Sequence, residues 1–275
     1  MKIPRVCALH DMSGVGRCAL TVVIPVLSAT GAQVCPVPTA LFSTHTGGFG
    51  DPASRDMTCL MDETLEHWNA LGLPFDAVYS GFLGSAKQIS VVERYICKFG
   101  GRGFTLVDPV LGDDGEIYKS ITPELCQKMK RLAESADIIT PNSTEAAILL
   151  GEKFTGFPQT KSGLIESVKH LGGKRSVIIT GADLREGVLG CAVYDSTDGS
   201  ATVIEGERLG GSFPGTGDIF ASVLLGSLLR GNNLLDSAAT AMEFVRSCVT
   251  VTLAAGTPAR EGVLLEAVIS ELIAK

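Results

Sequence analysis

The chain has 275 residues and a formal net charge of −7 at pH 7, and 45% of its residues are hydrophobic while only 6% are aromatic. This length and composition suit a single α/β domain over residues 1–275 with an aliphatic core. The negative charge, without a cluster of Lys and Arg, argues against nucleic acids and anionic membranes as partners.

Targeting signals and cysteine motifs are missing from the sequence as well. The first residues lack the long apolar run of a secretion signal, and no segment has the uninterrupted apolar length of a membrane helix. The eight cysteines are scattered singly, without the C-x-x-C pair of a zinc ribbon. We therefore expect a cytoplasmic protein with free, mostly buried thiols.

Short β-rich runs alternate with longer stretches of helical periodicity, a pattern typical of βαβ units on a mostly parallel sheet. The predicted core strands are Arg5–Leu9, Asp76–Ser80, Phe104–Val107, Asp137–Thr140 and Ser176–Thr180. The predicted helices are Cys18–Thr30, Thr58–Leu71, Ala86–Phe99, Pro123–Ser135, Ser143–Leu150, Lys161–Leu171, Asp218–Leu229, Leu234–Ala255 and Val263–Ala274. An antiparallel hairpin is predicted from Val188–Tyr194 and Ala201–Glu205. Left-handed helix C-caps are predicted at Gly31, Gly72, Gly100 and Gly172.

Small polar and acidic residues stand where the predicted strands end. They include His10, Asp11 and Ser13, then Ser80, Asp108, Thr140, Asn142 and Thr180. In an open parallel sheet, ligands bind outside the carboxyl ends of the strands. We therefore expect these residues to converge on one site.

The turn Gly215-Thr216-Gly217 runs into Asp218 and then into an apolar helical stretch. Backbone N–H groups at such a helix start form a pocket for an anion. A carboxylate there makes chemical sense if it takes a proton from a hydroxyl while the N–H groups hold a phosphoryl group. The segment alone also fits a simpler interpretation, in which Asp218 is a first-turn residue stabilised by the helix dipole.

Two further segments carry candidate nucleotide and metal chemistry. Asp108 follows a buried strand, where a charge is costly, and Asp113 lies in the loop after it; carboxylates of this kind suit Mg²⁺. Asp114 is typical of a turn. The segment from Thr140 to Glu145 follows a strand and opens a helix, so a helix cap explains it structurally without any function.

Residues 38–50 place four hydroxyl groups and His45 beside a glycine-rich tail. This composition favours a loop that hydrogen-bonds a polar small molecule and closes over it, although an ordinary exposed loop fits equally. Ser13-Gly14-Val15-Gly16 lacks the third glycine of a dinucleotide fingerprint. The sequence shows no transition-metal spacing, no nucleophile elbow and no Walker A ending.

Taken together, these motifs resemble the ribokinase superfamily, and within it the pyridoxal kinases, over essentially the whole chain. The resemblance implies a three-layer α/β/α sandwich with a mostly parallel central sheet. Gly215, Thr216 and Gly217 are similar to the family's anion hole, and Asp218 to its catalytic base. The resemblance implies nucleotide binding by Asp108, Asp113, Tyr118, Thr140, Asn142, Glu145, Thr180 and Thr216.

The vitamin B6 branch is indicated by residues 42–47, which resemble the loop over the pyridine ring, and by residues 80–85. The resemblance implies substrate binding by Asp11, Ser13, Ser43, His45, Thr46 and Phe82. The sequence departs from the pyridoxal kinase pattern at two positions. Phe82 stands where the family often has tyrosine. Asp11 is acidic, and an acidic residue at this place resembles the pattern of the hydroxymethylpyrimidine kinases.

The implied reaction uses ATP and Mg²⁺, with the metal held by Asp113 and Glu145 largely through water, to phosphorylate the hydroxymethyl group of a B6 vitamer. The resemblance also suggests a homodimer, and it leaves a requirement for K⁺ open. The alternatives are a kinase acting on hydroxymethylpyrimidine or a sugar, and a regulator that keeps the fold without turnover.

Overall fold

A computed structural model describes residues 2–154, 156 and 159–273. Within these residues, nine strands form one sheet in the order β11-β10-β9-β8-β5-β4-β1-β2-β3. Their bounds are β1 (Arg5–Ser13), β2 (Gln33–Phe42), β3 (Ser54–Asp56), β4 (Ala77–Ser80), β5 (Phe104–Val107), β8 (Ile138–Ile139), β9 (Ser176–Arg185), β10 (Val188–Tyr194) and β11 (Ala201–Glu207). The six strands from β9 to β2 run parallel, and β3, β10 and β11 add antiparallel edges. A separate two-stranded ribbon joins β6 (Gly112–Asp113) to β7 (Glu116–Ile117).

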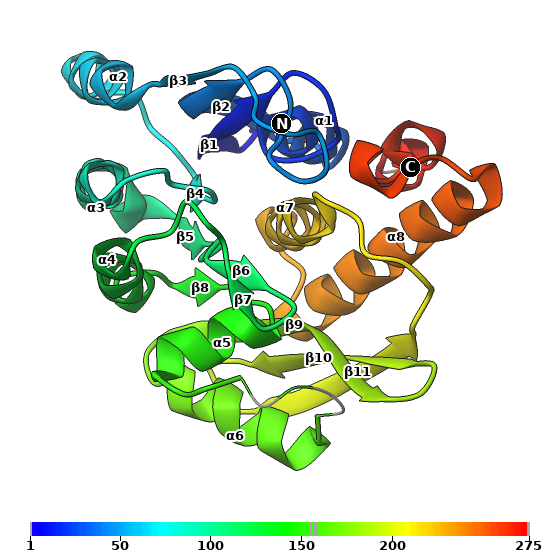
Figure 1. Ribbon diagram of the computed structural model, residues 1–275. Coiled ribbons are helices and arrows are strands. Elements are labelled where there is room, and N and C mark those ends of the chain that lie inside the picture. The colour runs from blue at the N-terminus through cyan, green and yellow to red at the C-terminus, as the bar shows by residue number, and fades with distance from the viewer. Residues whose placement is uncertain (1, 155, 157–158, 274–275) are drawn as a thin grey trace.

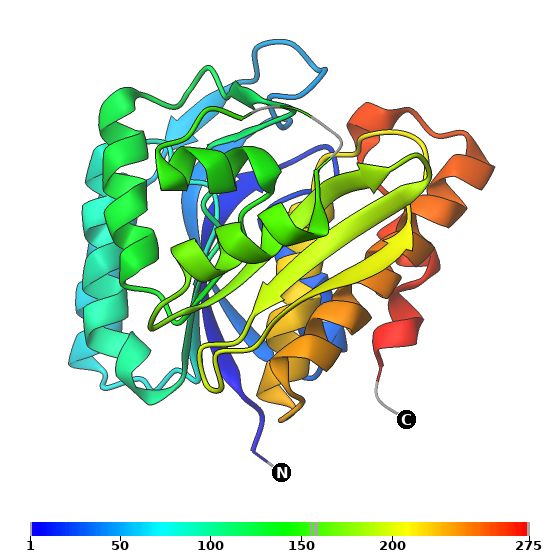
Figure 2. The same ribbon diagram turned by 90° about the horizontal axis from the view of Figure 1, so that it is seen from below.

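Helices cover both faces of the sheet (Figure 1, Figure 2). One face packs against α1 (Leu20–Ala29), α7 (Thr216–Leu229) and α8 (Leu234–Ala255). The other packs against α2 (Thr58–Ala70), α3 (Ala86–Phe99), α4 (Pro123–Glu134), α5 (Ser143–Leu150) and α6 (Lys161–Leu171). Each face therefore has its own hydrophobic core, and the expected three-layer α/β/α arrangement with a mostly parallel sheet is confirmed.

The central strands and the helix starts show why the sequence folds this way. All four residues of β4 are buried, as expected for a parallel strand covered on both faces. Ser85 and Thr122 cap α3 and α4, because their side chains accept the N–H groups of Gln88 and Leu125. The apolar runs form the buried strands, and the caps mark where the following helices begin. Polar residues lie in the connections between them.

Helix α8 has 22 residues and a mean hydropathy of 1.2, which by length and composition would allow it to cross a membrane. In the structure it packs along α7 and buries Ala238, Ala241 and Phe244 in the core of that face. The eight cysteines are all free, and four of them are buried.

Strands β1 and β9 continue past their predicted ends at Leu9 and Thr180, so His10, Asp11, Ser13 and Thr180 lie within strands rather than after them.

Three further sequence predictions are wrong. The helix predicted at Val263–Ala274 is replaced by short 3₁₀ turns, the main ones at Leu265–Ala267 and Ile269–Leu272, and Ala274 lies outside the described residues. Val263 and Leu265 are both buried, whereas two positions apart they would point to different sides of an α-helix.

The two other corrections concern glycines. Gly31 and Gly72 have the expected positive φ, but Gly100 and Gly172 both have φ −70°. Gly100 continues into the 3₁₀ helix η1 (Gly100–Arg102). Gly172 is instead required by close packing, because an ideal Cβ there would lie 2.4 Å from Cε1 of Tyr194.

Strand β2 was not predicted, because Pro36 and Pro38 interrupt its sequence. Strand β3 pairs only with residues 40–42 of β2. The two prolines therefore lie in the part of β2 that has β1 as its only partner, where a missing N–H group is tolerated.

Candidate active site

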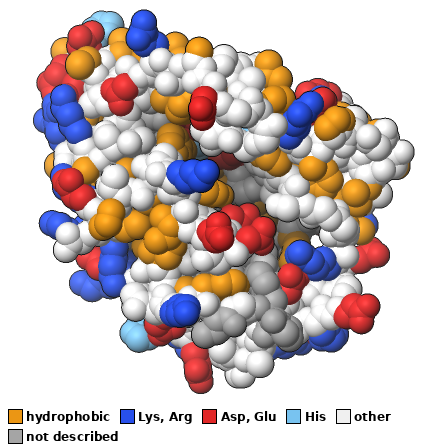
Figure 3. All heavy atoms as spheres, viewed as in Figure 1, with side chains coloured by type: hydrophobic (Ala, Val, Ile, Leu, Met, Phe, Trp, Pro, Cys, Tyr) orange, Lys and Arg blue, Asp and Glu red, His pale blue; other side chains and the backbone are white. Residues whose placement is uncertain are grey.

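Three connected cavities lie at the carboxyl ends of the central strands. The outer one, of about 430 Å³, shares Asp113, Asn142 and Thr216 with a middle one of about 300 Å³. The middle cavity shares Asp218 and Tyr118 with an inner one of about 160 Å³. Figure 3 shows a hollow near the middle of this face, with acidic side chains beside it. A ligand can therefore reach from an open outer chamber to Asp218.

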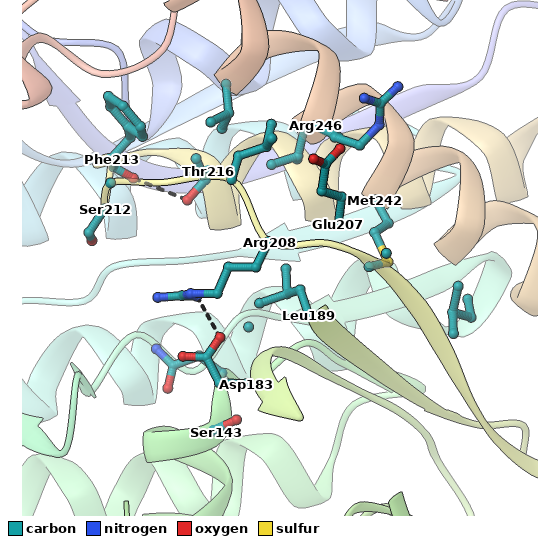
Figure 4. A pocket seen from close by; sticks show the side chains of 18 of the residues that line it. Ser143, Asp183, Leu189, Glu207, Arg208, Ser212, Phe213, Thr216, Met242 and Arg246 are labelled. Carbon is teal, nitrogen blue, oxygen red and sulfur yellow. Dashed lines mark hydrogen bonds and ion pairs between the residues drawn. The ribbon is translucent and has the colours of Figure 1, made fainter. Parts of the chain in front are cut away.

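The outer cavity is lined by β10, β11, α8 and the start of α5. Arg208 reaches across it to Asp183, with 2.8 Å between Nη1 and Oδ1, and Leu189 and Met242 add apolar surface (Figure 4). Gly206 leaves room for Met242, because an ideal Cβ there would lie 2.5 Å from Cε of Met242. The sequence indicates only the side of this chamber that it shares with the middle cavity, because β10, β11 and α8 carry no motif.

The middle cavity contains the glycine turn and all eight predicted nucleotide residues. Gly215 is the N-cap of α7 with φ 82°, and an ideal Cβ there would lie 2.0 Å from the carbonyl oxygen of Arg17. Only glycine fits this position. Thr216 donates its hydroxyl to the carbonyl of Phe213 over 3.1 Å. The first N–H groups of α7 have no partner within the helix, and the residues that carry them line this cavity. The predicted nucleotide residues that line it are Asp108, Asp113, Tyr118, Thr140, Asn142, Glu145, Thr180 and Thr216.

Four carboxyl groups border the middle cavity, and among the described residues that line it there is no Lys, Arg or His. Burial raises the pKa of Asp218 to about 7. Burial, together with the charge of Asp218, raises the pKa of Asp108 to about 8. Burial and the charge of Asp108 also raise the pKa of Glu145. The cavity is therefore built to receive positive charge.

Mg²⁺ carried by a nucleotide fits this donor set better than a resident metal ion. In the described part of the chain, no three His, Cys, Asp or Glu side chains are placed to hold a metal by themselves. Mg²⁺ keeps several waters and uses one or two carboxylates plus phosphate oxygens. Asp113 is the exposed carboxylate at this rim, and its Oδ1 accepts the N–H of Asp114.

Glu145 is occupied by backbone groups. Its Oε1 accepts the N–H of Leu111 at 3.0 Å, and its Oε2 accepts that of Asn142 at 2.8 Å. Asn142 completes a capping box on α5 and donates its side-chain amide to the carbonyl of Gly112. The capping interpretation is thus confirmed, with Asn142 as the cap. Together the pair fixes the loop that carries Asp108 and Asp113.

Asp218 lies where the middle and inner cavities meet. Its Oδ2 accepts the backbone N–H of Ala19 at 2.8 Å. Ala19 has φ 49° and ψ −136°, a conformation that a residue with a side chain rarely adopts. This strained residue aims its N–H at the carboxylate, and such strain is concentrated at functional sites.

The inner cavity contains five of the six predicted substrate residues: Asp11, Ser13, His45, Thr46 and Phe82. Ser43 is not among its lining residues; it is exposed, and its hydroxyl accepts the N–H of Ala53 at 3.0 Å. Ser43 thus ties the β2–β3 loop together. The position of Ser43 in the sequence does not indicate that its side chain is exposed and bonded to Ala53.

His45 shapes the inner cavity with its ring rather than with a free nitrogen. Its Nε2 lies 2.6 Å from the carbonyl oxygen of Arg260, and its Nδ1 accepts the N–H of Gly47 at 3.0 Å. Phe42 and Phe82 pack edge to face at 6.3 Å on another wall. Ser13 donates to Oδ2 of Asp11 at 2.9 Å. The cavity therefore offers aromatic walls and two carboxylates, Asp11 and Asp218, which suits a small heteroaromatic ring that carries a hydroxyl group.

Because the folded protein holds Asp218 and Asp108 with raised pKa values, we expect the ligand-free protein to lose stability as the pH rises. Between pH 4 and 8, these two carboxyl groups bind more protons in the folded state than in the unfolded chain. The free energy of unfolding therefore falls as the pH rises from about 4 to about 8. Asp218→Asn removes one of these groups. It should raise Tm by a few degrees at pH 8 and much less at pH 5, since one pKa unit corresponds to about 1.4 kcal/mol. A gain in Tm that is equal at the two pH values would contradict this prediction.

Comparisons with known proteins indicate the family of the chain. A model of the phosphomethylpyrimidine kinase family matches residues 24–262. A Schizosaccharomyces pombe protein described as a pyridoxal kinase is 32% identical over 204 residues, which is 70% of this chain but 58% of the relative's length.

Two solved structures align over nearly the whole chain. The pyridoxal kinase of Lactobacillus plantarum has a TM-score of 0.90 and 32% identity, covering 99% of this chain and 97% of its own. A Bacteroides thetaiotaomicron protein, described as a phosphomethylpyrimidine kinase and crystallised with pyridoxal, has a TM-score of 0.93 and 37% identity, covering 98% and 96%.

Proposed function

Because the chain belongs to the phosphomethylpyrimidine kinase family, we propose that it is an ATP-dependent kinase of vitamin B6. It transfers the γ-phosphoryl group of ATP to the 5′-hydroxymethyl group of pyridoxal, pyridoxine or pyridoxamine. One observation carries the proposal: Asp218 stands between an aromatic-walled inner cavity and the N–H groups of the Gly215 turn.

In the proposed reaction, the acceptor's ring lies in the inner cavity with its hydroxyl group at Asp218. The carboxylate takes the hydroxyl proton as that oxygen attacks the γ-phosphorus, and the bond to the β-phosphate oxygen breaks. The N–H groups of residues 215–217 stabilise the charge on the transferring group. Thr180 and Thr216 contact phosphates, and the outer cavity takes the adenosine.

When bound with the nucleotide, Mg²⁺ would neutralise charge on the phosphates, and Asp113 would hold it directly or through water. Glu145, with both oxygens engaged by N–H groups, contributes by fixing the loop. We further propose that residues 1–275 act as one domain in a cytoplasmic homodimer. Replacing K⁺ with Na⁺ in the assay tests the monovalent cation requirement.

A second candidate substrate is hydroxymethylpyrimidine. Asp11 is buried in the inner cavity and can accept hydrogen bonds from an exocyclic amine, which this pyrimidine carries. The match to the phosphomethylpyrimidine kinase family also favours this substrate. The mechanism at Asp218 is the same for both acceptors.

The test is ATP consumption with Mg²⁺ over a panel of the three B6 vitamers, hydroxymethylpyrimidine and ribose. Turnover confined to the B6 vitamers supports the proposal. A preference for hydroxymethylpyrimidine moves the assignment to the second candidate. Bound ATP without turnover of any acceptor supports a non-catalytic regulator.

Phe82→Ala should raise the KM of the acceptor about tenfold, because it removes roughly 1.5 kcal/mol of apolar contact with a bound ring. Phe82 lines the inner cavity but not the middle or outer one. The KM for ATP should therefore be unchanged. Steady-state kinetics with each substrate varied in turn checks both values, and an unchanged acceptor KM would place the ring elsewhere.

A further inference from the structure

His10 is fully buried behind Asp218, and neither of its ring nitrogens has a hydrogen-bond partner within the described residues. Its Nδ1 lies 3.8 Å from Oδ1 of Asp218, the oxygen that the Ala19 N–H does not contact. Leaving a buried polar group unpaired costs about 1–3 kcal/mol. Because an unpaired His10 next to the proposed base lowers the stability of the fold, we expect its ring nitrogens to have a function.

The fold holds the His10 ring in this position from three sides. Val6 and Ala8 face the core under α1 and α7, and His10 is the next residue of β1 on that face. Its ring packs edge to face on Tyr79 of β4, with 4.3 Å between ring centres. Gly81 leaves the necessary space, since an ideal Cβ there would lie 2.3 Å from Nδ1 of His10. These contacts place Nδ1 of His10 beside Oδ1 of Asp218.

We propose that His10 is a positioning residue for the catalytic base, donating its Nδ1–H to Oδ1 of Asp218 when the substrates are bound. The inference rests on the proposed function, in which Asp218 is the base. A distance of 3.8 Å is too long for a hydrogen bond, but catalytic hydrogen bonds are often long before substrates bind and tighten afterwards. Asp218 is then held by two donors, the Ala19 N–H on Oδ2 and His10 on Oδ1.

The surroundings of His10 determine its protonation and tautomer. The titratable groups that face the ring are Asp218 from α7 and Tyr79 from β4. Burial lowers the pKa of His10 to about 3, so the ring is neutral and carries one N–H. Among the described residues, the carboxylate paired with the ring lies at Nδ1, and this favours the Nδ1–H tautomer. A neutral donor orients the base without cancelling its charge, and each carboxylate oxygen keeps a lone pair for the substrate proton.

The matched pair His10→Asn and His10→Leu tests the proposal, because both shorten the side chain equally and only Asn keeps a donor near the place of Nδ1. We expect His10→Leu to lower kcat about 100-fold, the effect of losing one aligned donor, and His10→Asn to stay within about tenfold of wild type. The KM for ATP should be unchanged in both variants. Equal losses in the two variants would overturn the proposal and leave His10 as a packing residue.

The pH profile gives a readout that packing alone would not move. Removing a donor to the charged form raises the pKa of Asp218 in the substrate complex, so the acid limb of kcat should shift to higher pH in His10→Leu and stay near its wild-type position in His10→Asn. An acid limb at the same pH in all three proteins would also overturn the proposal.

The tautomer can be measured in the wild-type protein, even if His10→Leu does not fold. Imidazole ¹⁵N NMR of the protein with ADP, Mg²⁺ and pyridoxine should show the Nδ1–H form for His10, assigned with His45, His67 and His170 variants. An Nε2–H form would contradict the proposal. This readout does not need turnover. An inactive wild-type protein would overturn the proposed function, whereas the NMR result alone decides the inference about His10.

Discussion

Asp218→Asn is expected to lower kcat for the accepted vitamer about 10³-fold, because the variant has no carboxylate to take the hydroxyl proton. The amide keeps an oxygen that can accept the Ala19 N–H, so the strained turn and the fold should be preserved. Binding of ATP, which we propose occupies mainly the outer and middle cavities, should change little. Single-turnover kinetics and calorimetric titration with ATP separate the two effects.

The pH dependence of the wild-type enzyme provides the companion measurement. Burial raises the pKa of Asp218 to about 7, and the base must be deprotonated to act. We therefore expect kcat/KM for the acceptor to rise with pH up to about 7, with this limb absent from the residual activity of Asp218→Asn. A near wild-type kcat in the variant would falsify the assignment of Asp218 as the base.

The polar strand ends could be predicted because sheet topology decides where they lie. Asp108 and Thr180 are distant in sequence, yet Asp108 follows β5, and Thr180 lies in β9 just beyond the residues that pair with β8. Both therefore lie at the edge where the parallel strands end. The glycine turn before Asp218 could be recognised because its chemistry is local: consecutive residues supply both the N–H groups and the carboxylate. Features that depend on adjacent residues, or on the side of the sheet at which parallel strands end, could therefore be predicted from the sequence.

Other parts depend on tertiary contacts that leave no local pattern. Arg208 and Met242 line the same outer cavity because the β10–β11 hairpin lies near α8. His10 was visible as a strand-end residue, but its burial behind Asp218 and its missing partners follow from the packing of β1 against α7. The outward direction of Ser43 likewise depends on the short strand β3, which the sequence does not indicate.

Gly215→Ala is expected to reduce kcat about 100-fold and to lower Tm by several degrees. The new Cβ would lie 2.0 Å from the carbonyl oxygen of Arg17, and φ 82° is unfavourable for alanine by about 1–2 kcal/mol. The collision involves backbone on both sides, so either the anion turn or the segment leading to Ala19 must shift. Both shifts misplace a group that the reaction needs, the N–H groups at the phosphate or the donor to Asp218.

Gly256→Ala separates the collision from the cost of the backbone conformation. Gly256 has φ 65° at the C-cap of α8, and nothing lies within 4 Å of an ideal Cβ there. This control should lose a similar amount of stability from the positive φ alone and keep wild-type kcat. If Gly215→Ala behaves like Gly256→Ala in both Tm and kcat, the turn tolerates the methyl group and close packing on Arg17 is not what positions the anion site. A loss of kcat confined to Gly215→Ala shows that the contact between this turn and the β1–α1 connection holds the phosphate donors and the base in register.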